Sequence, residues 1–283
     1  MNAPNSTTIH RGKIRWRGGP SLMQNFPFPN TLIYYISMNP SSPKAYNKMI
    51  QSCKYFFEKN PILVISRITE KRTCPNERCS ITRDNTFNIN KTTSKFWLTE
   101  KLLLVEASPE FITSLCPKLY RCNIKKILIH KTTINFDDFK FLASSAETVY
   151  LFRSRLNYSD GSAVLFETIF VSLVKVKQFV HFFVQDDVSL ITEPSLMNIT
   201  KLKNFKNLRT LRMFNIPEIA FSDESILSFL NHCGSKNIQL YFKNISEEWK
   251  NQLDALKNSG NLSANHNIAY DNWGISHMHY HSF

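Results

Sequence analysis

The pattern of apolar and polar positions changes several times along the chain, and each change predicts a different kind of element. In the segment 39–57, NPSSPKAYNKMIQSCKYFF, apolar side chains recur at helical steps: Tyr46, Met49, Ile50, Cys53, Phe56 and Phe57. This spacing is typical of a helix with one buried face. The Asn-Pro-Ser-Ser-Pro in front of it supplies a turn and a helix start. We therefore expect a helix here that packs its apolar face against another part of the chain or a partner.

Two further short apolar segments flank this helix. The segment 26–40, FPFPNTLIYYISMNP, places Leu32, Ile33 and Ile36 on one face of a preceding helix. The run 60–68, NPILVISRI, is a compact apolar stretch opened by Asn-Pro. Two or three short helices in about forty residues are too small to bury all their apolar faces alone. They either dock on the rest of the chain or are completed by a partner.

The second part of the chain alternates between two patterns. Strand-like runs occur around Leu103 and at 125–130, 147–152, 177–183, 208–214 and 237–242, and their centres are separated by 25, 23, 30, 30 and 29 residues. Helix-like stretches follow the later runs, at 136–145, 162–173, 195–205, 223–233 and 246–260. Because the later steps are nearly constant, the alternation favours a leucine-rich-repeat-like solenoid, whose neighbouring units share one core. An ordinary α/β domain with βαβ crossovers gives the same alternation and is the competing interpretation.

These patterns divide the chain into five parts. We expect a flexible basic arm (1–24), a helical module (25–68), a linker or long loop (69–95), a repeat domain (96–260) and a C-terminal tail (261–283). The predicted fold class is therefore α/β, with a small N-terminal helical module followed by an irregular leucine-rich-repeat-like solenoid.

Charge is distributed unevenly along the chain. The net charge is +13, and no acidic residue precedes Glu58. A basic surface attracts nucleic acid, an anionic membrane or an acidic protein. The favoured interpretation of the arm (1–24) is an unstructured terminus. Its mixture of aromatic and basic side chains would also suit binding of single-stranded nucleic acid. The residues concerned are Arg11, Lys13, Arg15, Trp16 and Arg17.

No group of residues in the sequence predicts catalysis, a cofactor or a metal. The cysteines 74, 79, 116 and 122 are spaced too widely for a zinc knuckle. The histidines 277, 279 and 281 read as part of a loose tail, and His130 and His181 as packed strand residues. The acidic pair Asp137-Asp138 suits a helix start, and no known catalytic or phosphate-binding motif occurs. We therefore expect a protein that is not an enzyme.

The location of the protein is also an expectation from the sequence. No apolar run is long enough to span a bilayer, and the polar, basic start lacks the core of a signal peptide. We expect an intracellular protein, cytoplasmic or nuclear, that has no contact with a membrane.

Residues 26 to 68 resemble a divergent F-box. Phe28-Pro29 stands where that motif has Leu-Pro, and Leu32, Ile33 and Ile36 correspond to its first apolar helix. The segment 52–56, SCKYF, corresponds to its Cys-Lys-aromatic signature. The usual Asp-Leu before the second helix is replaced by Ser-Ser-Pro-Lys. An F-box followed by weak leucine-rich repeats looks like the layout of F-box families expanded in nematodes.

The resemblance implies a substrate-recognition adaptor of a cullin-RING (SCF-type) ubiquitin ligase. The F-box would dock on the adaptor subunit of the ligase, and the repeats would hold an unknown target protein. The implied contacts with the adaptor subunit are Phe28, Pro29, Leu32, Ile33, Ile36, Tyr46, Ile50, Cys53 and Phe56. The intramolecular alternative is that these side chains cap the first repeat. The alternative function is a basic nucleic-acid-associated protein, or a protein-interaction solenoid without a ligase role.

Overall fold

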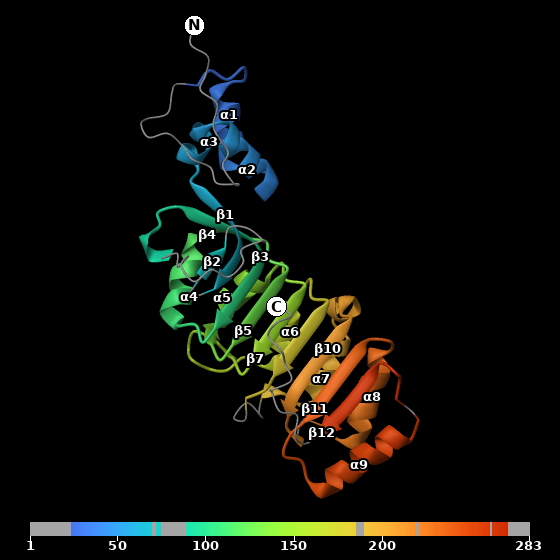
Figure 1. Ribbon diagram of the computed structural model, residues 1–283. Helices are drawn as coiled ribbons and strands as arrows, with labels where there is room; N and C mark the ends of the chain where they lie inside the picture. Colours follow the sequence, from blue (N-terminus) through green and yellow to red (C-terminus); the bar gives the residue numbers. More distant parts are fainter. Residues whose placement is uncertain are drawn as a thin grey trace.

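The computed structural model describes residues 24–69, 72–74, 89–184, 190–218, 221–260 and 262–270. Three short helices come first: α1 (Asn30–Met38), α2 (Pro43–Ser52) and α3 (Lys54–Lys59). The helix expected over 39–57 is interrupted at Cys53, whose extended backbone (φ −154°, ψ 130°) ends α2 and precedes α3. Figure 1 shows these helices beyond one end of a long sheet.

The described strands form one large sheet and one small one. The large sheet contains ten described strands and runs in the order β12-β11-β10-β9-β7-β5-β3-β1-β2, with β4 also paired to β3. All pairings are parallel except that of β1 with β2. Its strands are β1 (Ile62–Thr69), β2 (Arg72–Cys74), β3 (Lys95–Val105), β4 (Leu119–Cys122), β5 (Lys126–His130), β7 (Thr148–Phe152), β9 (Gln178–Phe182), β10 (Thr210–Ile216), β11 (Asn237–Phe242) and β12 (His266–Tyr270). The small sheet pairs β6 (Thr133–Asn135) with β8 (Arg155–Asn157).

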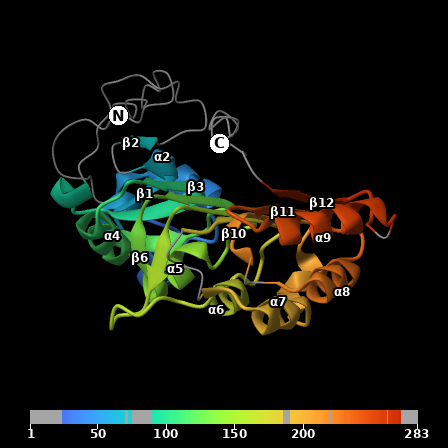
Figure 2. The same cartoon turned by 90° about the horizontal axis from the view of Figure 1, so that it is seen from below.

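The later helices all lie on one face of the large sheet, as Figure 2 shows. They are α4 (Pro109–Leu115), α5 (Phe136–Ala143), α6 (Phe166–Ser172), α7 (Glu193–Thr200), α8 (Asp223–Cys233) and α9 (Glu247–Asn258). Short 3₁₀ turns add η1 (Ile89–Lys91), η2 (Cys116–Lys118) and η4 (Lys203–Asn207). Side chains such as Ser108, Asn135 and Ser246 cap the starts of α4, α5 and α9 by accepting backbone N–H groups.

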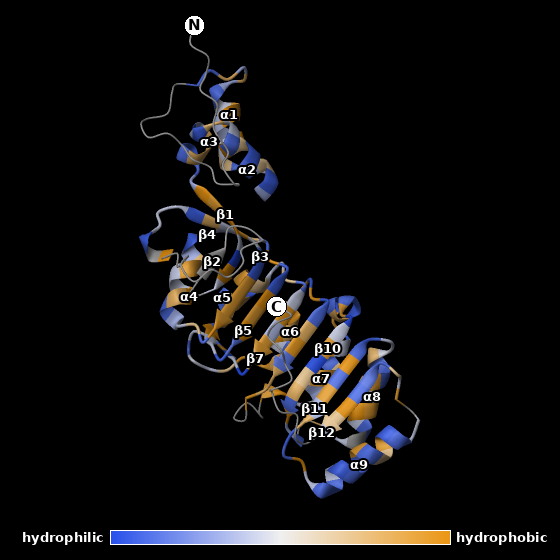
Figure 3. Cartoon of the chain, in the orientation of Figure 1, coloured by the Kyte–Doolittle hydropathy of each residue, from blue (hydrophilic) through white to orange (hydrophobic). Residues whose placement is uncertain are grey.

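Alternation along each strand divides its side chains between the two faces of the sheet. In β5, Ile127 and Ile129 join the main core under the helices, which extends along the sheet from Ile65 to Ile268. Leu128, between them in the strand, points to the other face of the sheet. There it belongs to a second, separate apolar cluster that also contains Phe152. Because both faces of the central strands carry apolar side chains, these strands read as near-continuous apolar runs, which Figure 3 shows in orange.

Several strands end in the same unusual backbone conformation. Glu106, Lys131 and Arg153 follow β3, β5 and β7 directly and have φ values of 51°, 47° and 48°. Each donates its N–H to the last residue of the next strand: Glu106 to His130 (2.8 Å), Lys131 to Phe152 (2.9 Å) and Arg153 to Phe182 (3.3 Å). The residue with positive φ therefore turns the chain out of the sheet, while its N–H group still makes a hydrogen bond to the neighbouring strand.

Buried hydroxyl groups continue this connection beyond the strand ends. The side-chain oxygen of Thr132 accepts the N–H of Ala107 (3.0 Å), and that of Ser154 accepts the N–H of Thr132 (3.3 Å). Both hydroxyl residues are almost fully buried. The segments after β3, β5 and β7 are thus linked to one another beyond the large sheet, directly before the point where β6 and β8 pair.

The structure contradicts the predicted fold class. The protein is α/β, but it is built on a continuous, mostly parallel central sheet, and the predicted leucine-rich-repeat-like solenoid behind a separate helical module is wrong. The run 62–69 is the clearest case, because it is strand β1 and pairs with β3 in this sheet. A short apolar run does not distinguish a strand from a buried helix, and alternating strands and helices also describe an ordinary α/β domain.

Candidate protein-interaction surface

Helix α1 has boundaries that the sequence sets locally. Pro29 precedes its first residue, and the carbonyl of Pro29 accepts the N–H groups of Leu32 (3.0 Å) and Ile33 (3.1 Å). At the other end, the backbone N–H and the side-chain amide of Asn39 both donate to the carbonyl of Tyr35 (2.9 and 3.0 Å). Asn39 therefore satisfies a free carbonyl at the end of the helix.

The inner face of α1 is packed within the protein. Ile33 is 5 % exposed and joins a small core made of Ile33, Tyr46, Ile50, Phe56, Ile62 and Trp97. Ser37, one turn further along α1, is also buried and donates its hydroxyl to the carbonyl of Ile33 (2.6 Å). Since Ile62 lies on β1 and Trp97 on β3, this core attaches the helices to the sheet.

Strand β4 also holds the last residue of α1 and the segment that follows it. The hydroxyl of Tyr120 donates to the carbonyl of Met38 (3.0 Å), and the guanidinium of Arg121 donates to the carbonyl of Pro40 (3.2 Å). Arg121 also lies over the ring of Trp97, 4.9 Å from its centroid. These contacts fix the orientation of α1 relative to the sheet.

The outer face of α1 is apolar and exposed. Leu32, Tyr35 and Ile36 lie on one stripe at steps of three and four residues, with 43 %, 64 % and 37 % of their surface exposed. Tyr34 and the preceding Phe28 are more than half exposed. A group of exposed apolar side chains marks an interaction surface more often than a single one does. We call these five residues the α1 patch.

The chain around the α1 patch carries positive charge. Helix α1 has no charged residue, while Lys44 and Lys48 are exposed on α2. Residues 1–57 contain no acidic side chain, and Glu58 pairs with Lys54 at 3.2 Å. A partner for the α1 patch would therefore offer an apolar groove with acidic residues near it.

The structure divides the predicted contact residues between the two faces. Phe28, Pro29, Leu32 and Ile36 are exposed, and Cys53 is half-buried. Ile33, Tyr46, Ile50 and Phe56 are buried in the small core. The four buried residues thus pack within the chain, while the exposed residues remain accessible to a partner. The predicted set omitted Tyr34 and Tyr35, although the step of three residues from Leu32 to Tyr35 was a signal for the second.

The other residues singled out from the sequence fall into two groups. The arm residues Arg11, Lys13, Arg15, Trp16 and Arg17 lie outside the described residues, as do the tail histidines 277, 279 and 281. Cys116 and Cys122 are described as free cysteines, and burial raises the pKa of their thiols to about 12 and about 11. Both thiols are therefore protonated at neutral pH. Nothing is described of Cys79 or of the Cys74 side chain.

Comparison with known proteins identifies no family for this chain. No protein-family model, curated protein or solved structure matches it. Within the described ranges, no helix has the length and apolar character needed to cross a membrane.

Proposed function

We propose that the protein is a non-enzymatic adaptor that docks through the α1 patch on the adaptor subunit of a cullin-RING ubiquitin ligase. The sheet domain would then carry a target protein. One observation supports the docking most directly: the inner face of α1 is fully used by the small core, while its outer face leaves Leu32, Tyr35 and Ile36 exposed. The F-box resemblance of residues 26 to 68 supplies the class of partner.

The chemistry of the α1 patch suits protein docking. Tyrosine is enriched among the few fully desolvated residues that supply most of the binding energy at the centre of an interface. The helix that carries them is held by Tyr120 and Arg121, so docking costs little ordering of the backbone. In this role the protein performs no bond chemistry itself and acts inside the cell, in the cytoplasm or the nucleus.

Co-expression of the full chain with the adaptor subunit tests the proposal. The wild type should form a stable one-to-one complex, and Leu32→Asp and Tyr35→Asp should weaken it at least about tenfold, because each places a charge in a desolvated apolar contact. Val171→Asp is the matched control, because Val171 on α6 is also apolar and 51 % exposed. Its binding should equal that of the wild type.

The outcomes separate the docking role from a purely structural one. Thermal unfolding should show that Leu32→Asp and Tyr35→Asp remain folded, since both side chains are exposed. Failure of a folded wild type to bind would leave the protein without a ligase role, and unchanged binding by both variants would place the contact outside the α1 patch. Salt-sensitive binding of RNA or DNA by the full chain would then favour the nucleic-acid alternative, which the net charge of +13 motivates.

A further inference from the structure

Four charged residues lie side by side at one edge of the central sheet, where its parallel strands begin. Lys125, Glu147, Lys177 and Arg209 precede β5, β7, β9 and β10. Their backbones are neighbours: Glu147 donates to the carbonyl of Lys125 (2.9 Å), Lys177 to Glu147 (2.7 Å) and Arg209 to Lys177 (2.7 Å). Adjacent strands lie about 4.8 Å apart, so these four side chains form a row with cations in three positions.

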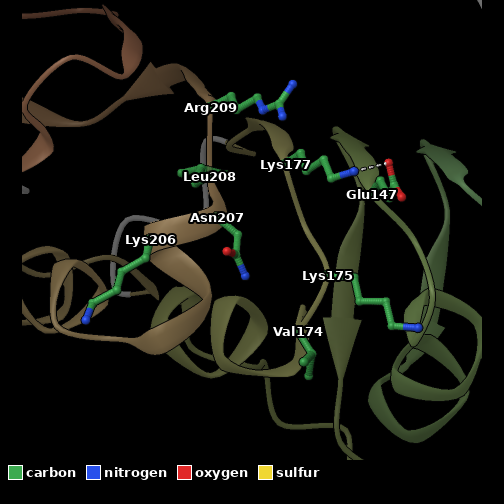
Figure 4. A pocket seen from close by; sticks show the side chains of 8 residues that line it. All are labelled: Glu147, Val174, Lys175, Lys177, Lys206, Asn207, Leu208 and Arg209. Carbon is green, nitrogen blue, oxygen red and sulfur yellow. Dashed lines mark hydrogen bonds and ion pairs between the residues drawn. The ribbon is translucent and has the colours of Figure 1, made fainter.

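A depression of about 560 Å³ lies beside this row. Its lining, drawn in Figure 4, consists of Glu147, Val174, Lys175, Lys177, Lys206, Asn207, Leu208 and Arg209. Leu208 is buried, whereas Val174 is 64 % exposed. The depression therefore combines positive charge with an accessible apolar side chain.

The acidic group in the lining is already neutralised. The carboxylate of Glu147 lies 2.7 Å from the ammonium of Lys177. The hydrogen bond from Lys177 and the charges of Lys177, Lys125 and Arg209 lower the pKa of Glu147. Among the described residues, no carboxylate pairs with Lys175, Lys206 or Arg209, and all three are exposed. These three cations give the depression its net positive charge.

The arrangement of the cations indicates the form of the ligand. In Figure 4, Lys206 and Lys175 lie on opposite sides of the labelled group, Arg209 lies on a third side, and the ends of these three side chains do not converge on one point. A single phosphate needs donors that converge on one point, whereas separated cations suit several anionic groups along a chain. Arg209 can also accept a carboxylate on two parallel N–H groups.

The remaining lining favours a peptide over a nucleic acid. Sites for single-stranded nucleic acid combine cations with aromatic side chains on which bases stack. Among the described residues that line this depression there is no aromatic side chain, while Val174 offers a contact for an aliphatic one. We propose that the depression binds an acidic peptide segment, in which carboxylates flank an aliphatic side chain. This proposal is independent of the docking proposed for α1.

The test measures binding of a fluorescent dodecapeptide, in which pairs of glutamates flank single valines, to the full-length protein. Anisotropy should show binding that weakens with added salt, and no binding of the same peptide with glutamine in place of glutamate. Arg209→Glu should weaken binding at least about tenfold, because it removes one cation and repels the ligand. Lys243→Glu, an equal charge change on an exposed lysine after the opposite end of β11, should leave affinity unchanged within about twofold.

Each other outcome overturns the proposal. A folded wild type that does not bind the acidic peptide rules out the site. Equal weakening by Lys243→Glu shows attraction by overall charge alone. A single-stranded oligonucleotide of the same length that binds more tightly, and that Arg209→Glu also weakens, makes the depression a nucleic-acid site. The Leu32→Asp variant should bind the peptide like the wild type, so failure of the docking proposal leaves this result unaffected.

Discussion

The hydroxyl of Tyr46 on α2 donates a hydrogen bond to the backbone carbonyl of Asn60 (2.7 Å), just before β1 begins. The same oxygen accepts the N–H of Ile62 (3.0 Å), and Tyr46 has no exposed surface. The side-chain amide of Asn60 donates in turn to the carbonyl of Ser37 on α1 (3.0 Å). This pair of residues therefore joins α1, α2 and the first strand of the sheet at one buried point.

Replacing Tyr46 by phenylalanine should destabilise the protein by about 1–3 kcal/mol, because the buried N–H of Ile62 loses its acceptor there. Chemical denaturation of the two proteins measures this difference. Tyr34→Phe is the matched control. Tyr34 is 54 % exposed, so its hydroxyl is solvated and its loss should change stability by less than about 0.5 kcal/mol. Equal effects of the two substitutions would contradict this role of Tyr46.

Aspartate at position 50 should have a different effect from aspartate at position 32. Ile50 is 8 % exposed in the small core, so Ile50→Asp buries a charge and should lower stability by at least about 3 kcal/mol. Leu32→Asp should remain within about 1 kcal/mol of the wild type, because Leu32 is 43 % exposed. Denaturant titration gives both values. If Leu32→Asp were equally destabilising, the outer face of α1 would be part of the core.

The positive φ of Glu106, directly after β3, predicts that glycine is more stable than alanine at this position. Glu106→Gly should be more stable than Glu106→Ala by about 1 kcal/mol, because φ is 51° and a Cβ atom is strained there. Both variants lose the ion pair with Lys131, so their difference isolates the backbone. At Glu167, in the first turn of α6, the order should reverse, with alanine more stable by about 0.5–1 kcal/mol. Thermal unfolding of the four variants measures both differences, and the same order of glycine and alanine at the two positions would contradict the prediction.

His181 should make stability depend on pH. Burial lowers its pKa to about 3, and its ring lies among those of Phe166, Phe179 and Phe183. The unfolded chain binds a proton near pH 6.5, while the folded protein excludes it, so stability should fall as pH decreases from about 6.5 towards 3. The slope from this residue is up to about 1.4 kcal/mol per pH unit. His181→Leu should remove that part of the slope, and an unchanged slope would show that His181 is protonated without unfolding.

The sequence located most elements of the sheet domain correctly but gave the wrong architecture. Strand β11 (Asn237–Phe242) and helix α8 (Asp223–Cys233) have the predicted bounds, and His181 is packed in a strand as expected. These elements have clear apolar periods and local end signals. Periodicity does not encode which strands share a sheet, and β1 was for this reason assigned to the helical module.

The same limit explains the mixed result for the α1 patch. Helical spacing identified Leu32 and Ile36 as candidate contacts, but it did not reveal that Ile33 and Ile50 turn towards Trp97, because Trp97 lies far away in the sequence. The depression beside β9 and β10 was also not predicted. Its cations Lys177 and Arg209 lie 32 residues apart in the sequence and are brought together by the pairing of β9 with β10.

The order of the strands has a consequence for synthesis on the ribosome. From β3 to β12, each long strand pairs with the long strand before it and the one after it, and β1 pairs with β3. The parts that hold the α1 patch, namely α1 to α3, β1, β3 and β4, are complete once residue 122 has been made. Domains generally fold as units, the N-terminal ones first during synthesis. The long strands from β5 to β12 leave the ribosome in the order in which they stand in the sheet, so each can pair with the edge formed by the long strand before it.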